Sequence, residues 1–404
     1  MAVDVALQAQ IDAQLLEQGA FSPLEFLIDS GRLLYSDYER WRRGDLDQLD
    51  GVLMGDLAKI QLQLEQAASL AGSMGLKEQP EDFFAWATPG PANRAHASLV
   101  ISADPGLQRL IGSRFVPAQK TPQMDLFFDN SVVALSNGVA HALRSCNLAD
   151  AQRQLDRLYA HAPNHADLVG FDRLVEALGR LRGSIPDVQQ ETDFLLGLAP
   201  IAKRLLGPQS RDFLTPLWRH LADALGERPF SQNQPQLHPS FALAQAHDWP
   251  SVSDAVRRES DWPDHPDLCL RMADSAFYRQ RRSEALGAWC HVCWRAPLKA
   301  AEHLDQRKTP DTGVAGLWRQ FLDTDEALTD TAEFPAWLLL HEPGLALQLA
   351  ADLPTQHSPG EEHYRCVHRW IHARRAGRTG EEVALRRALQ ASQPILFSYL
   401  MRRV

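Results

Sequence analysis

The sequence predicts an all-α protein of stacked helix pairs, preceded by a small helical N-terminal module. Two patterns predict this fold class. Apolar residues recur with the three-and-four spacing of amphipathic helices, and serines, glycines and prolines stand where such helices begin or end. The chain has 404 residues, 45% of them hydrophobic and 23% charged, so it can bury a large core and form two or more domains.

The N-terminal module is expected over residues 1–90, as several short helices. Ser22 is the expected N-cap of the second helix, and Gly31 is expected to end it. Ser36 and Gly44 mark a third helix in the same way. A longer fourth helix follows, with the apolar residues Leu57, Ile60, Leu62, Leu64 and Ala68.

Residues 91–130 are expected to connect this module to the rest of the chain. Prolines at 89, 91, 105, 117 and 122 interrupt the helical pattern there, and the apolar stretch Leu99–Ile101 suits an extended conformation. A segment of this length without structure is unusual in a compact domain. The connector is therefore expected either to pack on its neighbours or to carry function.

From residue 131 onward the pattern is that of helix pairs, with a first helical repeat region over residues 131–228. Gly138 and Ala142 are small residues on the first helix of a pair, and Pro163 closes the second. Small residues let two helices approach closely, and a proline ends the pair.

A second helical repeat region is expected over residues 240–404, after a linker rich in proline. Here Ala273 and Ala285 are the small residues of the two helices, and Pro297 closes the pair. Both pairs resemble the tetratricopeptide repeat, a family of helix pairs about 34 residues long. The resemblance covers two clear units and implies a degenerate α-solenoid that binds protein partners.

Charge is unevenly distributed along the chain, whose net charge is −10. Residues 1–90 hold fifteen Asp or Glu against six Lys or Arg, a net charge of −9. Residues 363–404 hold nine arginines against two glutamates, a net charge of +7. These opposite charges predict intramolecular docking or homo-oligomerisation through the two ends. The acidic total argues against general nucleic-acid binding.

The expected location is the cytoplasm of a bacterial-type cell. No apolar run approaches the roughly 20 residues that cross a bilayer, and the first ten residues lack the pattern of a secretion signal. The five cysteines are too few and too scattered for a disulfide framework. We therefore expect no membrane contact.

Two groups of residues have the spacing of metal ligands. Cys290 and Cys293 form a CxxC pair, but no second pair accompanies them. A second cluster consists of His363, Cys366, His368 and His372. Histidines four apart share a helical face, but the glutamate of the metalloprotease motif is missing and arginines surround them. Packing is the favoured interpretation of the CxxC pair, and ordinary exposed or capping histidines are the favoured interpretation of the cluster. No cofactor is expected.

The leading functional hypothesis is a non-enzymatic scaffold or adaptor that binds a peptide or a partner helix on a concave helical face. The tetratricopeptide resemblance implies that the partner-binding residues are Asn137, Arg144, Arg271, Asp274 and Tyr278. One alternative is an enzyme or accessory subunit that uses the CxxC pair or the His/Cys cluster to bind metal. Another is a regulator that contacts nucleic acid through the basic C-terminus.

Overall fold

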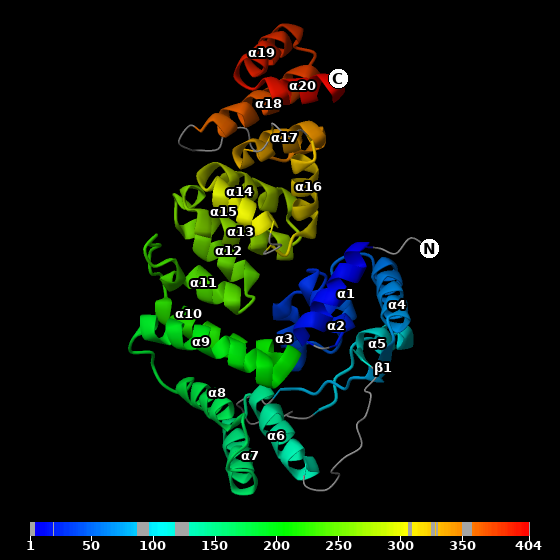
Figure 1. The fold of residues 1–404 in the computed structure, drawn as a ribbon, viewed down its shortest axis with the longest axis vertical. Coiled ribbons are helices and arrows are strands. Elements are labelled where there is room, and N and C mark those ends of the chain that lie inside the picture. Colours follow the sequence, from blue (N-terminus) through cyan, green and yellow to red (C-terminus); the bar gives the residue numbers. More distant parts are fainter. Residues whose placement is uncertain are drawn as a thin grey trace. The chain divides into compact units, whose positions relative to one another are not determined.

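The computed structural model describes residues 5–18, 20–86, 97–117, 129–305, 309–324, 328, 330–349 and 358–403, and it confirms the all-α fold class (Figure 1). Helices that follow one another in the chain pack against each other. The chain divides into two compact units. The first unit is residues 1–228 with 236–248, and the second is residues 229–235 with 249–404.

The first unit begins with the N-terminal module, described between residues 5 and 117. It contains two short strands, Leu76–Pro80 and Ser113–Pro117, which pair antiparallel with Leu76 opposite Pro117, and Phe115 also pairs with Phe21. The elements of the module are α1 (Val5–Gln18), α2 (Pro23–Asp29), α3 (Tyr35–Arg42), η1 (Asp50–Val52), α4 (Leu57–Ser73), β1 (Leu76–Pro80), α5 (Pro105–Ile111) and β2 (Ser113–Pro117).

Part of the expected connector packs into this module. Residues 97–117 contribute α5 and β2, and Ile101, Leu107, Leu110 and Phe115 are buried in the module's apolar core. The prolines at 89, 91 and 122 lie outside the described residues.

Three of the four residues predicted to begin or end helices of the module are confirmed, and one prediction is wrong. The Ser22 hydroxyl accepts a hydrogen bond from the backbone N–H of Glu25, as an N-cap should. Gly31 and Gly44 follow their helices with φ values of +68° and +79°, which glycine adopts without strain. The prediction for Ser36 is wrong, because α3 already begins at Tyr35 and Ser36 lies inside it.

The remaining helices of the first unit form consecutive packed pairs around a second apolar core, which includes Leu143, Leu174, Leu198 and Phe213. The predicted small residue Ala142 is buried between them. These helices are α6 (Asp129–Arg144), α7 (Leu148–His161), α8 (Leu168–Arg180), α9 (Val188–Leu206), α10 (Ser210–Leu225) and α11 (Pro239–Gln245), with the short η2 (Gly207–Gln209) before α10. The short η3 (Pro235–Leu237) precedes α11, and its first residue belongs to the second unit.

The second unit consists of further helix pairs, with α13 packed on α14, α17 on α18 and α18 on α19. Ala273 on α13 and Ala285 on α14, the predicted small residues of this pair, are both buried. The elements are α12 (Trp249–Arg258), η4 (Trp262–Asp264), α13 (Pro266–Tyr278), α14 (Arg282–Arg295), α15 (Pro297–Asp305), α16 (Thr312–Leu322), η5 (Thr331–Glu333), α17 (Phe334–His341), η6 (Pro343–Leu347), α18 (Pro359–Arg375), α19 (Thr379–Ser392) and α20 (Pro394–Arg403).

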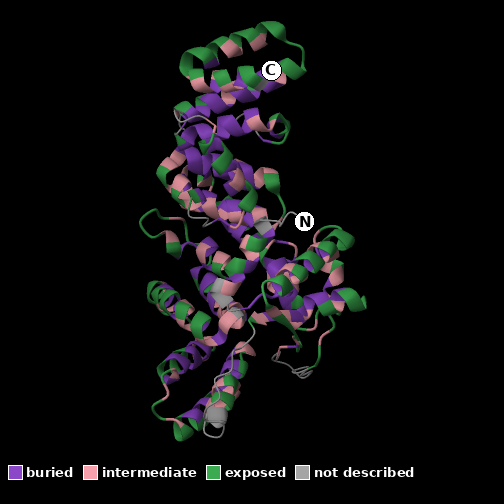
Figure 2. Cartoon of the chain, turned by 45° about the vertical axis from the view of Figure 1, so that its right-hand side comes forward, coloured by how far each residue is buried: buried purple, intermediate pink, exposed green. Residues whose placement is uncertain are grey.

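Packing in the second unit is tight enough to require glycine at one helix start. A Cβ atom on Gly360, in the first turn of α18, would lie 2.2 Å from the backbone oxygen of Ala332 in η5. Figure 2 shows buried residues along the facing sides of paired helices and exposed residues on their outer sides. Among the helices of the described chain, none has the length and apolar character of a membrane span.

Candidate partner-binding site

The two cysteines of the CxxC pair are buried in the second half of α14. Burial raises the pKa of the Cys290 thiol to about 12 and the pKa of Cys293 well above its ordinary value. A metal or a redox partner needs a thiolate, which this surrounding disfavours. Both side chains therefore act as small apolar residues in the helix pair.

The second cluster, which consists of three histidines and Cys366, lies on α18, and each of its side chains forms a hydrogen bond with another part of the protein. His368 and His372 stack on each other, with ring centroids 4.6 Å apart. In the described parts of the chain, no group of three or more His, Cys, Asp or Glu side chains is placed to hold a metal ion. The bonds join His363 Nδ1 to Glu333 Oε1 at 2.8 Å, His368 Nε2 to the Leu349 oxygen at 3.0 Å, His372 Nε2 to the Ala346 oxygen at 2.9 Å, and Cys366 Sγ to the Leu385 oxygen at 3.4 Å.

Two of the predicted partner-binding residues belong to α6. Asn137 is exposed on this helix. Arg144 is half-buried, and its Nη2 donates to the backbone oxygen of Leu206, the last residue of α9, at 3.1 Å. Burial, with the neighbouring Arg114 charge, lowers the pKa of Arg144. Arg144 thus supports the end of a neighbouring helix, while Asn137 faces solvent.

The other three predicted residues belong to α13. Nη2 of Arg271 donates to the backbone oxygen of Pro235 at 2.8 Å. The Tyr278 ring stacks on Trp249, with centroids 4.3 Å apart. Both side chains hold local structure in the second unit. Asp274 is half-buried, and burial, followed by the Asp311 carboxylate, raises its pKa to about 7.

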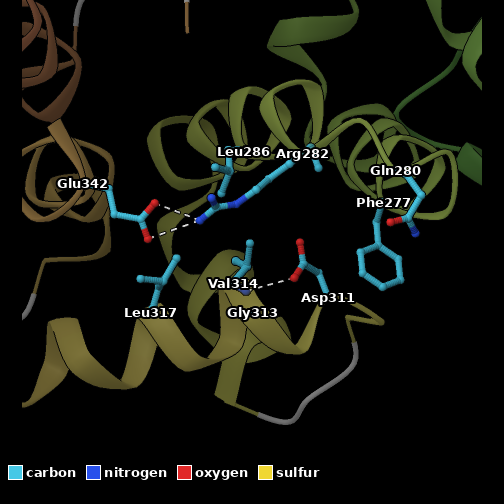
Figure 3. A pocket seen from close by; sticks show the side chains of 10 residues that line it. Phe277, Gln280, Arg282, Leu286, Asp311, Gly313, Val314, Leu317 and Glu342 are labelled. Atoms are coloured by element: carbon cyan, nitrogen blue, oxygen red, sulfur yellow. Dashed lines mark hydrogen bonds and ion pairs between the residues drawn. The ribbon is translucent and has the colours of Figure 1, made fainter. Parts of the chain in front are cut away.

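A pocket of about 390 Å³ lies beside the C-terminal end of α13 (Figure 3). Its charged side chains already have partners. Arg282 binds both carboxylate oxygens of Glu342, at 2.9 and 3.2 Å, and Asp311 accepts the backbone N–H of Val314 at 3.0 Å. Arg282 and Glu342 balance each other's charge, and the remaining carboxylate, that of Asp311, is bonded to a backbone N–H, so the pocket has no positive charge in excess for an anionic ligand. Its lining consists of Phe277, Gln280, Arg282, Ala285, Leu286, Asp311, Gly313, Val314, Leu317 and Glu342.

A second pocket, of about 580 Å³, lies where α17, η6, α18 and α20 meet. Its walls are apolar, and its cationic groups are two arginines from the last turn of α18. We call it the arginine pocket. It is lined by Leu340, Pro343, Gly344, Trp370, Ile371, Arg374, Arg375 and Leu400.

Within the described chain, the two arginines of this pocket have no carboxylate partner, unlike four other arginines of the same region. Neither Arg374 nor Arg375 forms an ion pair with any residue that the structure describes, and both are exposed. The Arg374 guanidinium lies 5.4 Å from the centroid of the Trp370 ring. Neighbouring arginines pair as Arg365 with Glu361 at 2.6 Å, Arg369 with Glu381 at 3.5 Å, Arg378 with Glu381 at 2.7 Å and Arg386 with Glu382 at 2.5 Å.

Unpaired arginines at the end of a helix have one structural explanation, since a positive charge there complements the helix dipole. That explanation does not require an apolar pocket beside them. An apolar cavity with two guanidinium groups that have no carboxylate partner among the described residues matches a ligand that has an apolar side chain next to a negative charge.

Sequence reasoning recognised the basic C-terminal segment but not this pocket. Arg374, Arg375 and Trp370 are close in sequence, whereas Leu340 and Leu400 come from other helices. The usable signal was the absence of an acidic residue between Glu362 and Glu381, which leaves the last turn of α18 without a local partner.

Comparison of the chain with protein-family models, with curated proteins and with solved structures gives no match.

Proposed function

We propose that this protein is a non-enzymatic partner-binding scaffold, and that the arginine pocket holds a segment of its partner in which a carboxylate lies next to a large apolar side chain. The observation that carries the proposal is that two arginines without carboxylate partners in the described chain line an apolar pocket. The helix-pair packing supports a tetratricopeptide-like scaffold as the setting. We place that scaffold in the cytoplasm.

The size of the pocket suits one or two side chains. A volume of about 580 Å³ falls in the range of small-molecule sites. Burying one large apolar side chain contributes roughly 1.5–3 kcal/mol. A bidentate arginine–carboxylate bond adds affinity and fixes the orientation of the segment. A single such anchor gives weak binding, so the partner is expected to use further contacts for full affinity.

The experiment uses a minimal probe with the two required groups. N-acetylphenylalanine has a carboxylate beside an aromatic side chain, and its amide has the same shape without the charge. Binding to the full chain is followed by the NMR signal of tryptophan indole groups, because Trp370 lines the pocket. We expect the acid to bind with a dissociation constant in the millimolar range and the amide to bind at least tenfold more weakly.

A pair of variants tests the role of the arginines. Arg374→Gln with Arg375→Gln should abolish the preference for the acid. Arg319→Gln with Arg387→Gln changes the net charge equally at exposed positions that do not line the pocket, and should preserve the preference. Equal binding of acid and amide, or an unchanged preference without Arg374 and Arg375, contradicts the proposal.

The nucleic-acid alternative depends on the same basic segment. Three arginines of α18 and α19, and Arg378 between these helices, are paired with glutamates, which lowers the charge available to phosphates. The same assay with a short oligonucleotide decides between the two ligands. The predicted association between residues 1–90 and 363–404 stays a prediction.

A further inference from the structure

The N-terminal module has an apolar core of its own. Phe21, Trp41 and Phe115 belong to a cluster formed only by residues of the module. Leu174 and Phe213 belong to the separate cluster of the helices α6 to α11. The two cores belong to one compact unit but share no residue. Residues outside these two clusters, or polar contacts between them, must therefore join the module to the helices α6 to α11.

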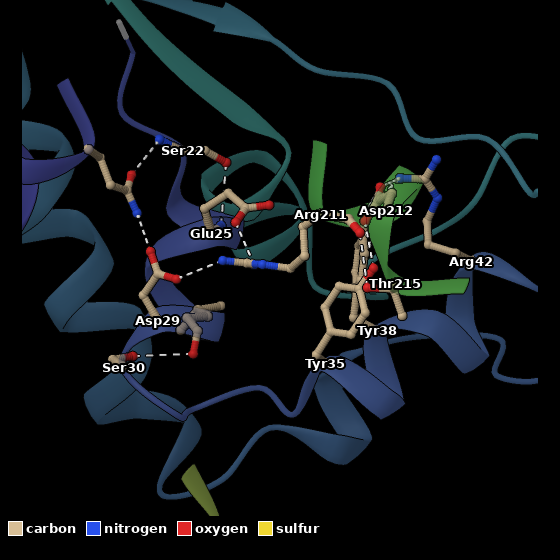
Figure 4. Close-up of polar contacts among 12 residues, drawn as sticks. Ser22, Glu25, Asp29, Ser30, Tyr35, Tyr38, Arg42, Arg211, Asp212 and Thr215 are labelled. Carbon is tan, nitrogen blue, oxygen red and sulfur yellow. Dashed lines mark hydrogen bonds and ion pairs between the residues drawn. The ribbon is translucent and has the colours of Figure 1, made fainter. Parts of the chain in front are cut away.

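The contact between the module and α10 is built around a buried carboxylate (Figure 4). The side chain of Asp212 is only 6% exposed. The Tyr35 hydroxyl donates to its Oδ1 at 2.9 Å, and the Tyr38 hydroxyl donates to its Oδ2 at 3.0 Å. The Arg42 guanidinium lies 3.7 Å from the same Oδ2 and compensates the charge.

Two arginines of α10 extend this contact. Arg211 binds Glu25 at 2.7 Å and Asp29 at 3.0 Å, and its side chain is 17% exposed. Arg219 pairs with Glu39. In each pair the arginine belongs to α10 and the carboxylate to the module.

The groups on α10 share one side of the helix. Arg211, Thr215 and Arg219 are four residues apart, which places them in one row, and Asp212 lies next to that row. We call this surface the α10 face and define it by these four residues. The arginines of the α10 face match the acidic side chains of the module in charge, and Asp212 accepts the hydrogen bonds of the module's two tyrosines.

A charged, hydrogen-bonded interface between two separate cores is typical of contacts that form between independently folded parts. Buried ion pairs add little net stability, because desolvation offsets most of their attraction. They do exclude wrong partners, because an unpaired buried charge is costly. The α10 face is therefore better suited to recognition than to holding a single core together.

We propose that the α10 face is a recognition surface for the N-terminal module, and that the module of a second copy of this chain can occupy it in place of the chain's own. Exchange of modules between two copies remakes the same contacts, so it is a low-cost route to a dimer. This inference is independent of the arginine pocket and of the partner proposed for it.

The test uses two full-length charge-reversal variants. The face variant has Arg211→Glu and Arg219→Glu, and the module variant has Glu25→Arg and Glu39→Arg. Each variant alone places like charges in contact, so docking should fail. Hydrogen exchange of the backbone amides in residues 23–42 should become at least tenfold faster, and each variant should remain monomeric.

Mixing the two variants restores opposite charges only between different chains. We expect the equimolar mixture to form a species of twice the monomer mass, with protection of residues 23–42 recovered. The control is the chain with all four substitutions, in which docking within one chain is restored and the monomer is expected. A mixture that stays monomeric while each variant alone has lost protection overturns exchange between copies.

A second measurement needs no substitution. Raising the salt concentration of the unmodified protein from 50 to 500 mM should speed exchange in residues 23–42 more than in α4. Both segments share the module's core, but the ion pairs and hydrogen bonds to α10 named above come from residues 23–42 and not from α4. Equal effects on both segments would overturn the polar-docking argument even if a variant failed to fold.

Discussion

Replacing Asp274 by asparagine tests whether the folded protein holds this carboxyl group in its protonated form. Asp274 is half-buried on α13, and its pKa is raised to about 7 by burial and then by the Asp311 carboxylate. No hydrogen bond or ion pair to a residue of the described chain stabilises its negative charge. Asparagine has nearly the same shape and cannot ionise. The substitution should therefore remove a pH-dependent cost.

The sign and size of the effect follow from proton linkage. An aspartate in an unfolded chain titrates near ~3.9, so between that pH and about 7 the folded state keeps a proton that the unfolded state has lost. The free energy of unfolding must then fall as the pH rises through this range and level off above it. With ~1.4 kcal/mol for each pKa unit, the fall between pH 5 and pH 8 is at most ~3 kcal/mol. Because Asp274 retains contact with solvent, we expect ~1–2 kcal/mol.

The assay is urea unfolding of the wild type and of Asp274→Asn at pH 5 and pH 8, followed by tryptophan fluorescence. The difference between the two proteins cancels the titration of every other group. Asp274→Asn should gain stability over the wild type as the pH rises. The control Asp311→Asn keeps the cap on Val314 and removes only the neighbouring charge, so the wild-type pH dependence should move to lower pH. A difference between wild type and Asp274→Asn that does not change with pH refutes the reasoning.

Three further predictions concern packing and burial. Gly360→Ala should lower the melting temperature by at least ~3 °C, because the added Cβ atom meets the backbone of Ala332. Gly380→Ala is the control, since the space around Gly380 is open, and it should leave the melting temperature unchanged. Equal melting temperatures of the two variants would contradict this. Asp212→Ala should cost ~3–5 kcal/mol in urea unfolding because it leaves a partly buried guanidinium without its counter-charge, and a cost below 1 kcal/mol would contradict the assigned network. Cys290 and Cys293 should react with a thiol reagent only after unfolding, as mass spectrometry can check, and rapid labelling of the native protein would show that they are accessible.

The helix caps show how far local sequence can go. Ser22 and Gly31 act through groups within three or four residues of themselves, so their roles could be predicted. Ser36 was misjudged because α3 starts one residue earlier, at Tyr35. Tyr35 is buried, and its hydroxyl donates a hydrogen bond to Asp212, which lies 177 residues away in sequence. The first residue of α3 therefore takes part in a distant contact that local capping rules do not include.

The predicted partner-binding residues show the limit of carrying positions over from a repeat pattern. The pattern located α13 correctly. It could not show that the Arg271 guanidinium donates to the backbone oxygen of Pro235 or that the Tyr278 ring stacks on Trp249. In the same way, the spacing of Cys290 and Cys293 suits a metal, while their burial disfavours the thiolate that a metal needs.

The sequence by itself determined the all-α class, the small residues Ala273 and Ala285 of one helix pair and the helix ends marked by Ser22, Gly31 and Gly44, because periodicity and capping act within a few residues. Only the tertiary structure decided which charges are paired. Arg211 has two carboxylates from a module nearly 190 residues away, while Arg374 has none in the described chain. The physical reason is that an ion pair depends on distance in space, and residues far apart in the sequence come within 4 Å only when the chain has folded.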